Sequence, residues 1–346
     1  MLNWHGLAAR TSGLVAVLAT LAFTVNSAAA EQPASSSAWY AAYVRDSELV
    51  RLANGRSLNL YCMGSGSPTV ILESGLGGSA YSWWTVQEKI AKLTRVCAYD
   101  RAGSGKSPPG PFPRDTRAQV GDLEQLLLAA KVKPPYVLVG HSMGGYNVRV
   151  FASRHMHDVV GLVFVDSATE NQIPLLHSAV PASAENDKRS ISRAQACADP
   201  ARSAEIAEQC TRSAPKDFPP ALAKIFADTQ GLSASQTFLS EVESFLAVDS
   251  QQVIAEDRRF GTLPLIVLTR GALSSNLPRD QAELEWKHWN QTHDKLAKLS
   301  KAGSHRVIAD ADHYIQLDKP DAVIAAVSEV VTLARKRGSR PTLDRH

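Results

Sequence analysis

The segment Gly140-His141-Ser142-Met143-Gly144 constrains the fold of this chain more than any other part of the sequence. It fits the pattern Gly-x-Ser-x-Gly, and it lies between an apolar run at 136–139 and a helix-like segment at 143–155. At a sharp strand-to-helix turn the serine adopts a strained backbone conformation, and side chains in place of the two glycines would clash. The turn exposes the hydroxyl group and directs the first amides of the helix toward it. We therefore predict that Ser142 is a nucleophile at the end of a strand.

Strand-like and helix-like segments alternate on both sides of this turn. The strand candidates are residues 58–62, 69–72, 96–99, 136–139, 162–165, 265–269 and 306–308, and the helix candidates are residues 83–93, 116–131, 143–155, 282–299 and 321–335. This alternation indicates an α/β fold with a mostly parallel, doubly wound sheet that helices cover on both faces.

The alternation stops between residues 169 and 261. That segment is rich in Ala, Ser and charged residues, and its periodic stretches indicate helices but no strand. We predict that 169–261 forms a helical cap, inserted into one α/β domain made of residues 31–168 and 262–335. The basic tail 336–346 is expected to be mobile.

Residues 1–30 have the pattern of a secretory signal peptide. Arg10 is their only charged residue, an apolar run covers 13–25, and the segment ends in an Ala-x-Ala site. A membrane-spanning helix needs about 20 apolar residues, so the run is short for one, although an uncleaved anchor is the alternative. We expect export to the periplasm or beyond, with no membrane span after cleavage. The formal charge of +3 is too small to indicate a nucleic-acid or anionic-membrane partner.

The segment Gly103-Ser104-Gly105-Lys106-Ser107 matches a phosphate-binding loop only in part. A Walker A loop has another glycine five positions before the glycine that precedes the lysine, and here that position is Asp100. Two prolines after the segment also disfavour the helix that such a loop requires. The chain contains no Cys/His or His/Glu cluster with metal-ligand spacing. We therefore predict neither a nucleotide site, nor a metal, nor another cofactor.

A serine hydroxyl needs a neighbouring base to become a nucleophile. His313 follows the last predicted strand by a few residues, where a loop at the carboxyl edge of the sheet belongs. The glycine-rich segment 73–78 follows another strand, and its glycines allow the backbone to approach a ligand closely. We predict that the backbone amides of Leu76 and Met143 form an oxyanion hole beside Ser142.

Together these segments resemble the α/β-hydrolase fold superfamily. The resemblance rests on the loop at 74–78, the segment 99–107, the Gly-x-Ser-x-Gly turn and Asp312-His313 before a final helix. It implies a serine hydrolase with a lid. Two features depart from the pattern of many members. Ser74-Gly75 stands in place of His-Gly, and the strand at 265–269 is followed by Arg270 and a segment without an acidic residue.

The family order Ser, Asp, His is met by Ser142, Asp166 and His313. Asp166 ends a strand at the sheet edge where Ser142 also belongs, and some members of the resembled family carry their acid there. We therefore predict Asp166 as the carboxylate that orients His313. One alternative acid is Asp280, which requires residues 271–279 to fold back over the site. The other alternative is a purely structural role for Asp166.

The four cysteines allow three pairings, and no Cys-x-x-Cys pair is present. Cys197 and Cys210 lie 13 residues apart in one polar segment, which leaves Cys62 for Cys97. In the resembled fold the second strand neighbours the fourth, and Cys62 and Cys97 lie in these two strands. We predict both disulfides, with four buried thiols as the alternative.

These features predict an exported serine hydrolase that cleaves an ester or related acyl bond of a small molecule through an acyl-enzyme. The same residues could serve acyl transfer, or the cleavage of an amide, a lactone or a carbon–carbon bond. A non-catalytic binding protein with this fold is the alternative from another functional class.

Overall fold

The computed structural model describes residues 40–44, 49–211, 213–256 and 258–338. The predicted signal segment lies outside these residues, as does the tail from 339 onward. Residues 336–338 form the end of the last helix rather than the start of a separate tail. None of the helices in the described ranges is long and apolar enough to cross a bilayer.

The core of the fold is an eight-stranded sheet with the order β1-β2-β4-β3-β5-β6-β7-β8. The strands are β1 (Leu49–Arg51), β2 (Ser57–Met63), β3 (Thr69–Glu73), β4 (Val96–Asp100), β5 (Tyr136–His141), β6 (Val159–Val165), β7 (Leu265–Arg270) and β8 (Gly303–Ile308). Strand β2 pairs antiparallel with β1 and β4, and all other neighbours are parallel. This confirms the predicted mostly parallel sheet.

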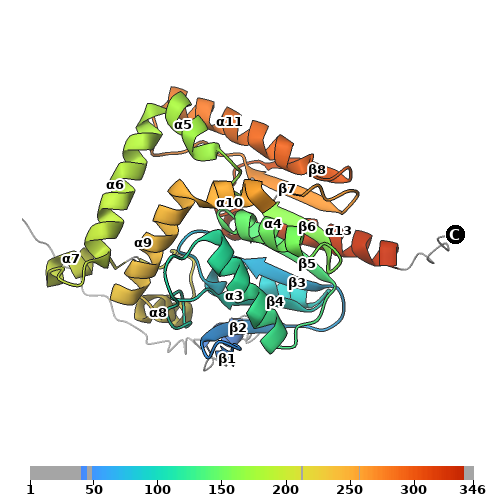
Figure 1. The fold of residues 1–346 in the computed structure, drawn as a ribbon. Coiled ribbons are helices and arrows are strands. Elements are labelled where there is room, and N and C mark those ends of the chain that lie inside the picture. Colours follow the sequence, from blue (N-terminus) through green and yellow to red (C-terminus); the bar gives the residue numbers. More distant parts are fainter. Residues whose placement is uncertain (1–39, 45–48, 212, 257, 339–346) are drawn as a thin grey trace, which may run out of the picture. The chain divides into compact units, whose positions relative to one another are not determined.

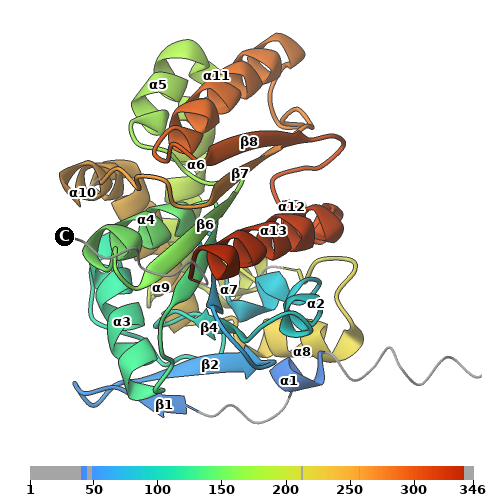
Figure 2. The same ribbon diagram turned by 90° about the vertical axis from the view of Figure 1, so that its right-hand side faces the viewer.

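Helices cover both faces of the sheet (Figure 2). On one face lie α3 (Thr116–Ala129) and α4 (Gly144–Arg154), and on the other lie α2 (Gln87–Ala91) and α13 (Pro320–Gly338). The sequence of strand β3 is continuously apolar because both of its faces are buried. Ile71 packs into the core on one face of the sheet, while Val70 and Leu72 pack into the core on the other face. The remaining helices of this domain are α1 (Ala41–Val44), the 3-10 helix η1 (Ala80–Trp83), α11 (Arg279–Ala297) and α12 (Ile315–Asp318).

Six helices and no strand occupy the described residues between β6 and β7. They are α5 (Gln172–Ala179), α6 (Pro181–Ala198), α7 (Ala204–Gln209), α8 (Pro220–Asp228), α9 (Leu232–Ala247) and α10 (Asp249–Glu256). The long helices α6 and α9 pack along each other (Figure 1), and α10 returns to pack on α4. We call α5 to α9 the cap.

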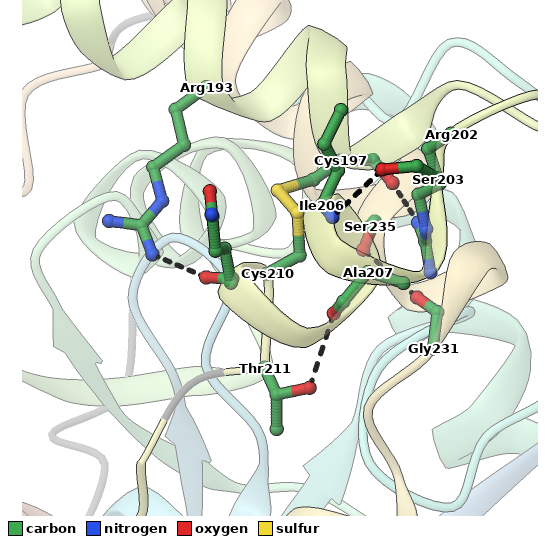
Figure 3. Close-up of a disulfide and its surroundings, with 11 residues drawn as sticks. Arg193, Cys197, Arg202, Ser203, Ile206, Ala207, Cys210, Thr211, Gly231 and Ser235 are labelled. Carbon is green, nitrogen blue, oxygen red and sulfur yellow. Dashed lines mark hydrogen bonds between the residues drawn. A yellow bond between two sulfur atoms is a disulfide. The ribbon is translucent and has the colours of Figure 1, made fainter.

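Both cysteine pairs expected from the sequence are joined in the structure. Cys62 in β2 lies directly opposite Cys97 in β4, with a Cα–Cα distance of 4.1 Å. Cys197 at the end of α6 is bonded to Cys210, the residue that follows α7 (Figure 3). The guanidinium of Arg193 also donates a hydrogen bond of 2.8 Å to the carbonyl of Gln209. The second disulfide therefore joins the ends of two consecutive cap helices.

Candidate active site

Ser142 occupies the sharp turn between β5 and α4. Its φ of 51° is in the left-handed region, which is unfavourable for a serine. A Cβ on Gly140 would lie 2.7 Å from the carbonyl oxygen of Gly144, and a Cβ on Gly144 would lie 2.7 Å from the carbonyl oxygen of Glu73. The two glycines are therefore required by close backbone contacts. The amide of Ser142 donates to the carbonyl of Val165, which ties the turn to the end of β6.

The structure brings three predicted site residues into one chain of hydrogen bonds. His313 lies on the loop between β8 and α12, and its Nε2 is 3.0 Å from the Oγ of Ser142. The Nδ1 of the same ring is 2.7 Å from an oxygen of Asp166, the residue that follows β6. This is the geometry in which a carboxylate fixes the tautomer of a histidine that faces a serine hydroxyl.

Asp166 is fully buried and accepts four hydrogen bonds. Its Oδ1 accepts from the amide of Arg270 at 3.0 Å and from the indole N–H of Trp289 at 2.7 Å. Its Oδ2 accepts from His313 and, at 3.0 Å, from the guanidinium of Arg270. Burial by itself raises the pKa of Asp166, but the hydrogen bond and charge of His313, followed by the charge of Arg270, hold it well below its usual range. Asp166 is therefore an ionised carboxylate.

The alternative acid lies elsewhere. Asp280 is exposed in the first turn of α11, and no hydrogen bond in the described part of the chain joins it to His313. Asp312 accepts a hydrogen bond of 2.7 Å from the backbone amide of His313, not from its ring. Of the two carboxylates proposed from the sequence, Asp166 contacts the ring of His313 and Asp280 does not.

Arg270 and Trp289 contact Asp166, and neither is predicted as a site residue from the sequence. Arg270 bridges two carboxylates, because its guanidinium also lies 3.0 Å from an oxygen of Glu285 in α11. The position of Arg270 in the sequence could have indicated this role. It ends β7, which pairs with β6, so it lies at the same carboxyl edge of the sheet as Asp166. Trp289 lies in the middle of α11, and nothing in its local sequence indicates a partner just after β6.

His141 is a further residue of the site, inside the Gly-x-Ser-x-Gly turn. Its Nε2 donates a hydrogen bond of 3.0 Å to the backbone carbonyl of His313, and its ring centroid is 4.8 Å from that of His313. Burial, and then the charge of His313, lower the pKa of His141 to about 3. A neutral His141 thus holds the backbone of the loop that carries His313.

The glycine-rich loop lies against the serine. A Cβ on Gly75 would lie 2.9 Å from the Cβ of Ser142, so only glycine fits there. The next amide, that of Leu76, and the amide of Met143 donate no hydrogen bond to any residue that the structure describes. Two unused backbone donors therefore flank the hydroxyl-bearing residue.

A cavity of about 410 Å³ extends from this loop toward the cap. Its aromatic lining consists of Tyr81, Phe218, Phe226, Phe238 and Tyr314. Its charged lining consists of Asp217, Asp312 and Asp318. The lining includes no Lys, Arg or His from the described residues, so the cavity suits an apolar group and disfavours an anion.

Comparisons with known proteins agree with this architecture. A family profile described as alpha/beta hydrolase fold matches residues 68–268. The uncharacterized protein YqjL of Bacillus subtilis (strain 168) is 26% identical over 267 residues, which is 77% of this chain and 85% of YqjL.

Solved structures of enzymes share the fold. A thermophilic esterase from Thermogutta terrifontis superposes with a TM-score of 0.60 at 19% identity, covering 84% of this chain and 99% of the esterase. The epoxide hydrolase CorEH superposes with a TM-score of 0.55 at 18% identity, covering 83% of this chain and 99% of CorEH. The family profile matches more than half of the chain, and the fold is shared with these solved structures. The chain therefore belongs to the α/β-hydrolase family.

Proposed function

We propose that this protein is a serine hydrolase that cleaves an ester or a related acyl bond of a small molecule. The observation that carries the proposal is the hydrogen-bonded chain from Ser142 Oγ to His313 Nε2 at 3.0 Å and from His313 Nδ1 to Asp166 at 2.7 Å. The unused amides of Leu76 and Met143 support it, because they supply donors for an oxyanion.

The proposed reaction proceeds through an acyl-enzyme. The Oγ of Ser142 attacks the carbonyl carbon while its proton passes to Nε2 of His313, and the carbonyl oxygen becomes an oxyanion held by the amides of Leu76 and Met143. When the tetrahedral intermediate collapses, the bond between the carbonyl carbon and the alcohol oxygen breaks. His313 donates its proton to that oxygen, and the alcohol leaves. Water then attacks the acyl-serine with His313 as base, which releases the carboxylic acid and restores the hydroxyl. Asp166 remains deprotonated and stabilises the imidazolium of His313 in both steps.

We also propose that the protein acts outside the cytoplasm. The signal-like segment 1–30 supports this proposal, and so do the two disulfides, because such bonds persist in oxidising compartments. N-terminal sequencing of the protein recovered from its host would test it. A start at residue 31 is expected, and an uncleaved Met1 would contradict cleavage.

Covalent labelling and hydrolysis test the enzymatic proposal together. We expect a fluorophosphonate to form one adduct, on Ser142, and a panel of p-nitrophenyl esters to be hydrolysed by the wild type but not by Ser142→Ala. Hydrolysis that persists in Ser142→Ala would refute the mechanism. If no adduct forms and no ester is cleaved, a binding protein of the same fold becomes the better interpretation. Adding an alcohol acceptor and measuring the ratio of acid to new ester separates hydrolysis from acyl transfer.

A further inference from the structure

The loop that carries the Leu76 amide is held at three backbone groups by one buried ion pair. The guanidinium of Arg101 donates to the carbonyl of Ser74 and to the carbonyl of Gly75, each at 2.7 Å. The carboxylate of Glu241 accepts from the amide of Gly77 at 2.8 Å. These contacts lie directly on either side of the amide of Leu76.

Arg101 uses all five of its N–H groups in this arrangement. Two bind the carbonyls of the loop, and one binds Glu73 at 2.9 Å. The other two bind the two oxygens of Glu241, at 2.9 and 3.2 Å. Arg101, Glu73 and Glu241 are each at most 2% exposed, so these charges are removed from water. A fully bonded, buried guanidinium has a single orientation, which makes it a rigid support for the loop.

Glu241 reaches this loop from the cap. Glu241 lies in α9 and is 164 residues from Gly77 in the chain. Its bonds to Arg101 and Gly77 therefore connect the cap to the backbone next to Ser142. If the cap moved away from the α/β domain at this point, Arg101 and Gly77 would lose their hydrogen bonds to Glu241. Such a movement is strongly unfavourable because it would leave buried charges unpaired.

Peptide geometry links these contacts to the direction of the Leu76 amide. The bond between Gly75 and Leu76 is trans, so its C=O and N–H lie in one plane and point in opposite directions. The C=O is held by Arg101 and also accepts from the amide of Gly78 at 3.0 Å. The N–H must then point away from the guanidinium, and it has no acceptor among the residues of the described ranges.

We propose that Glu241, acting through Arg101 and Gly77, is a positioning residue through which the cap sets the oxyanion-binding amide of Leu76. This inference rests on the proposed serine-hydrolase function. It assigns the cap a role in transition-state stabilisation in addition to lining the cavity. A donor that is misplaced by about 1 Å can cost about a hundredfold in rate, and the loss of one oxyanion donor costs about 10²- to 10³-fold.

The test compares Glu241→Gln with Glu243→Gln, a matched change on the exposed side of the same helix. We expect Glu241→Gln to lower kcat for p-nitrophenyl butyrate about 10- to 100-fold, with KM changed by less than about twofold. The inhibition constant of phenylboronic acid, which forms a tetrahedral adduct with the serine, should rise in the same proportion as kcat falls. Glu243→Gln should match the wild type. Active sites are counted with a fluorophosphonate taken to completion, so that loss of folded protein does not count as loss of rate.

Glu241→Asp provides a second variant if Glu241→Gln does not fold, because it keeps the charge and withdraws the carboxylate from Gly77. An unchanged kcat per active site in whichever variant folds would overturn the inference, as would a rise in KM with normal kcat. These results differ from failure of the proposed function, in which the wild type itself forms no fluorophosphonate adduct and cleaves no ester.

Discussion

Arg270 and His313 donate to the same oxygen of Asp166. The guanidinium is 3.0 Å from Oδ2, and Nδ1 of the ring is 2.7 Å from it. The carboxylate that orients the ring is thus partly neutralised by a buried cation, which is itself paired with Glu285 at 3.0 Å. Arg270 therefore helps to fix the carboxylate oxygen that contacts the ring of His313.

This relationship predicts the kinetic effect of a double variant, Arg270→Gln with Glu285→Gln. Removing both charges avoids an unpaired Glu285 and leaves Trp289 and the amide of residue 270 as donors to Asp166. Oδ2 of Asp166 loses one of its two donors, so the carboxylate is held less firmly against the ring of His313, and kcat should fall by about tenfold. Steady-state kinetics with one ester measure the loss. Arg279→Gln with Glu283→Gln, an exposed pair on α11, is the control and should leave kcat unchanged. A normal kcat in the first variant would refute this role of Arg270.

The identity of the acid can be tested with two isosteric changes. Asp166→Asn should reduce kcat by about 10⁴-fold, because the amide can bind the ring in the wrong tautomer and cannot stabilise the imidazolium. Asp280→Asn changes an exposed side chain and should leave kcat as in the wild type. Steady-state kinetics with one ester decide between them. Near-normal turnover in Asp166→Asn together with a large loss in Asp280→Asn would reverse our assignment.

Asp249, at the start of α10, should make stability depend on pH. Burial, supported by the charges of Asp115 and Glu241, raises its pKa from the ordinary 3.8 to about 7. Between about pH 4 and pH 7 the folded protein then holds a proton that the unfolded chain has lost, so the free energy of unfolding decreases as the pH rises through this window. The decrease is at most about 1.4 kcal/mol for each pH unit.

Asp249→Asn should remove that dependence and stabilise the protein at pH 8. The amide oxygen can still accept from the amide of Thr116, which lies 2.8 Å from Oδ1 of Asp249. Urea denaturation at pH 5 and pH 8 measures the effect, with the exposed Asp228→Asn as the control. Equal pH dependence in Asp249→Asn and the wild type would show that Asp249 is not the responsible group.

The charges of the cavity predict selectivity among esters of similar size. Three aspartates line it without a basic side chain among the described residues, so a cationic ester such as a choline ester should have a higher kcat/KM than an anionic one such as a hemisuccinate. One charge at about 4 Å in water contributes about 1 kcal/mol. Asp217→Asn should therefore lower kcat/KM for the cationic ester by about fivefold and raise that for the anionic ester by about fivefold, which narrows their ratio by about 30-fold. Added salt should narrow the ratio as well. A preference for the anionic ester would refute the prediction.

The central part of the fold could be predicted because its residues carry strong local signals. Strands β3 to β7 are buried on both faces and read as continuous apolar runs, and the glycines around Ser142 are required by backbone contacts that any such turn makes. Strand β1 was missed because it has three residues, none of which is buried.

The helix predicted at 83–93 is instead a 3-10 turn that ends at Trp83 followed by the short helix α2. Tertiary contacts override the local periodicity here, since Trp83 binds the hydroxyl of Ser74 and the side chain of Gln87 donates to the carbonyl of Tyr61 at 2.7 Å. The local sequence around Glu241 and Trp289 likewise does not indicate their roles, because those roles depend on tertiary contacts. Their partners lie more than a hundred residues away, and their neighbours in sequence contain no trace of them.

Cys62 faces Cys97 across the antiparallel pair of β2 and β4, within a ladder that also matches Leu60 to Tyr99 and Asn59 to Asp100. Side chains alternate between the two faces of a sheet, so a slip of one residue would turn one of the two sulfurs to the opposite face. Oxidation can therefore join these cysteines only when the two strands are correctly aligned. Formation of this disulfide would therefore report correct alignment of β2 with β4, and a misaligned chain would be recognisable by its unreacted thiols.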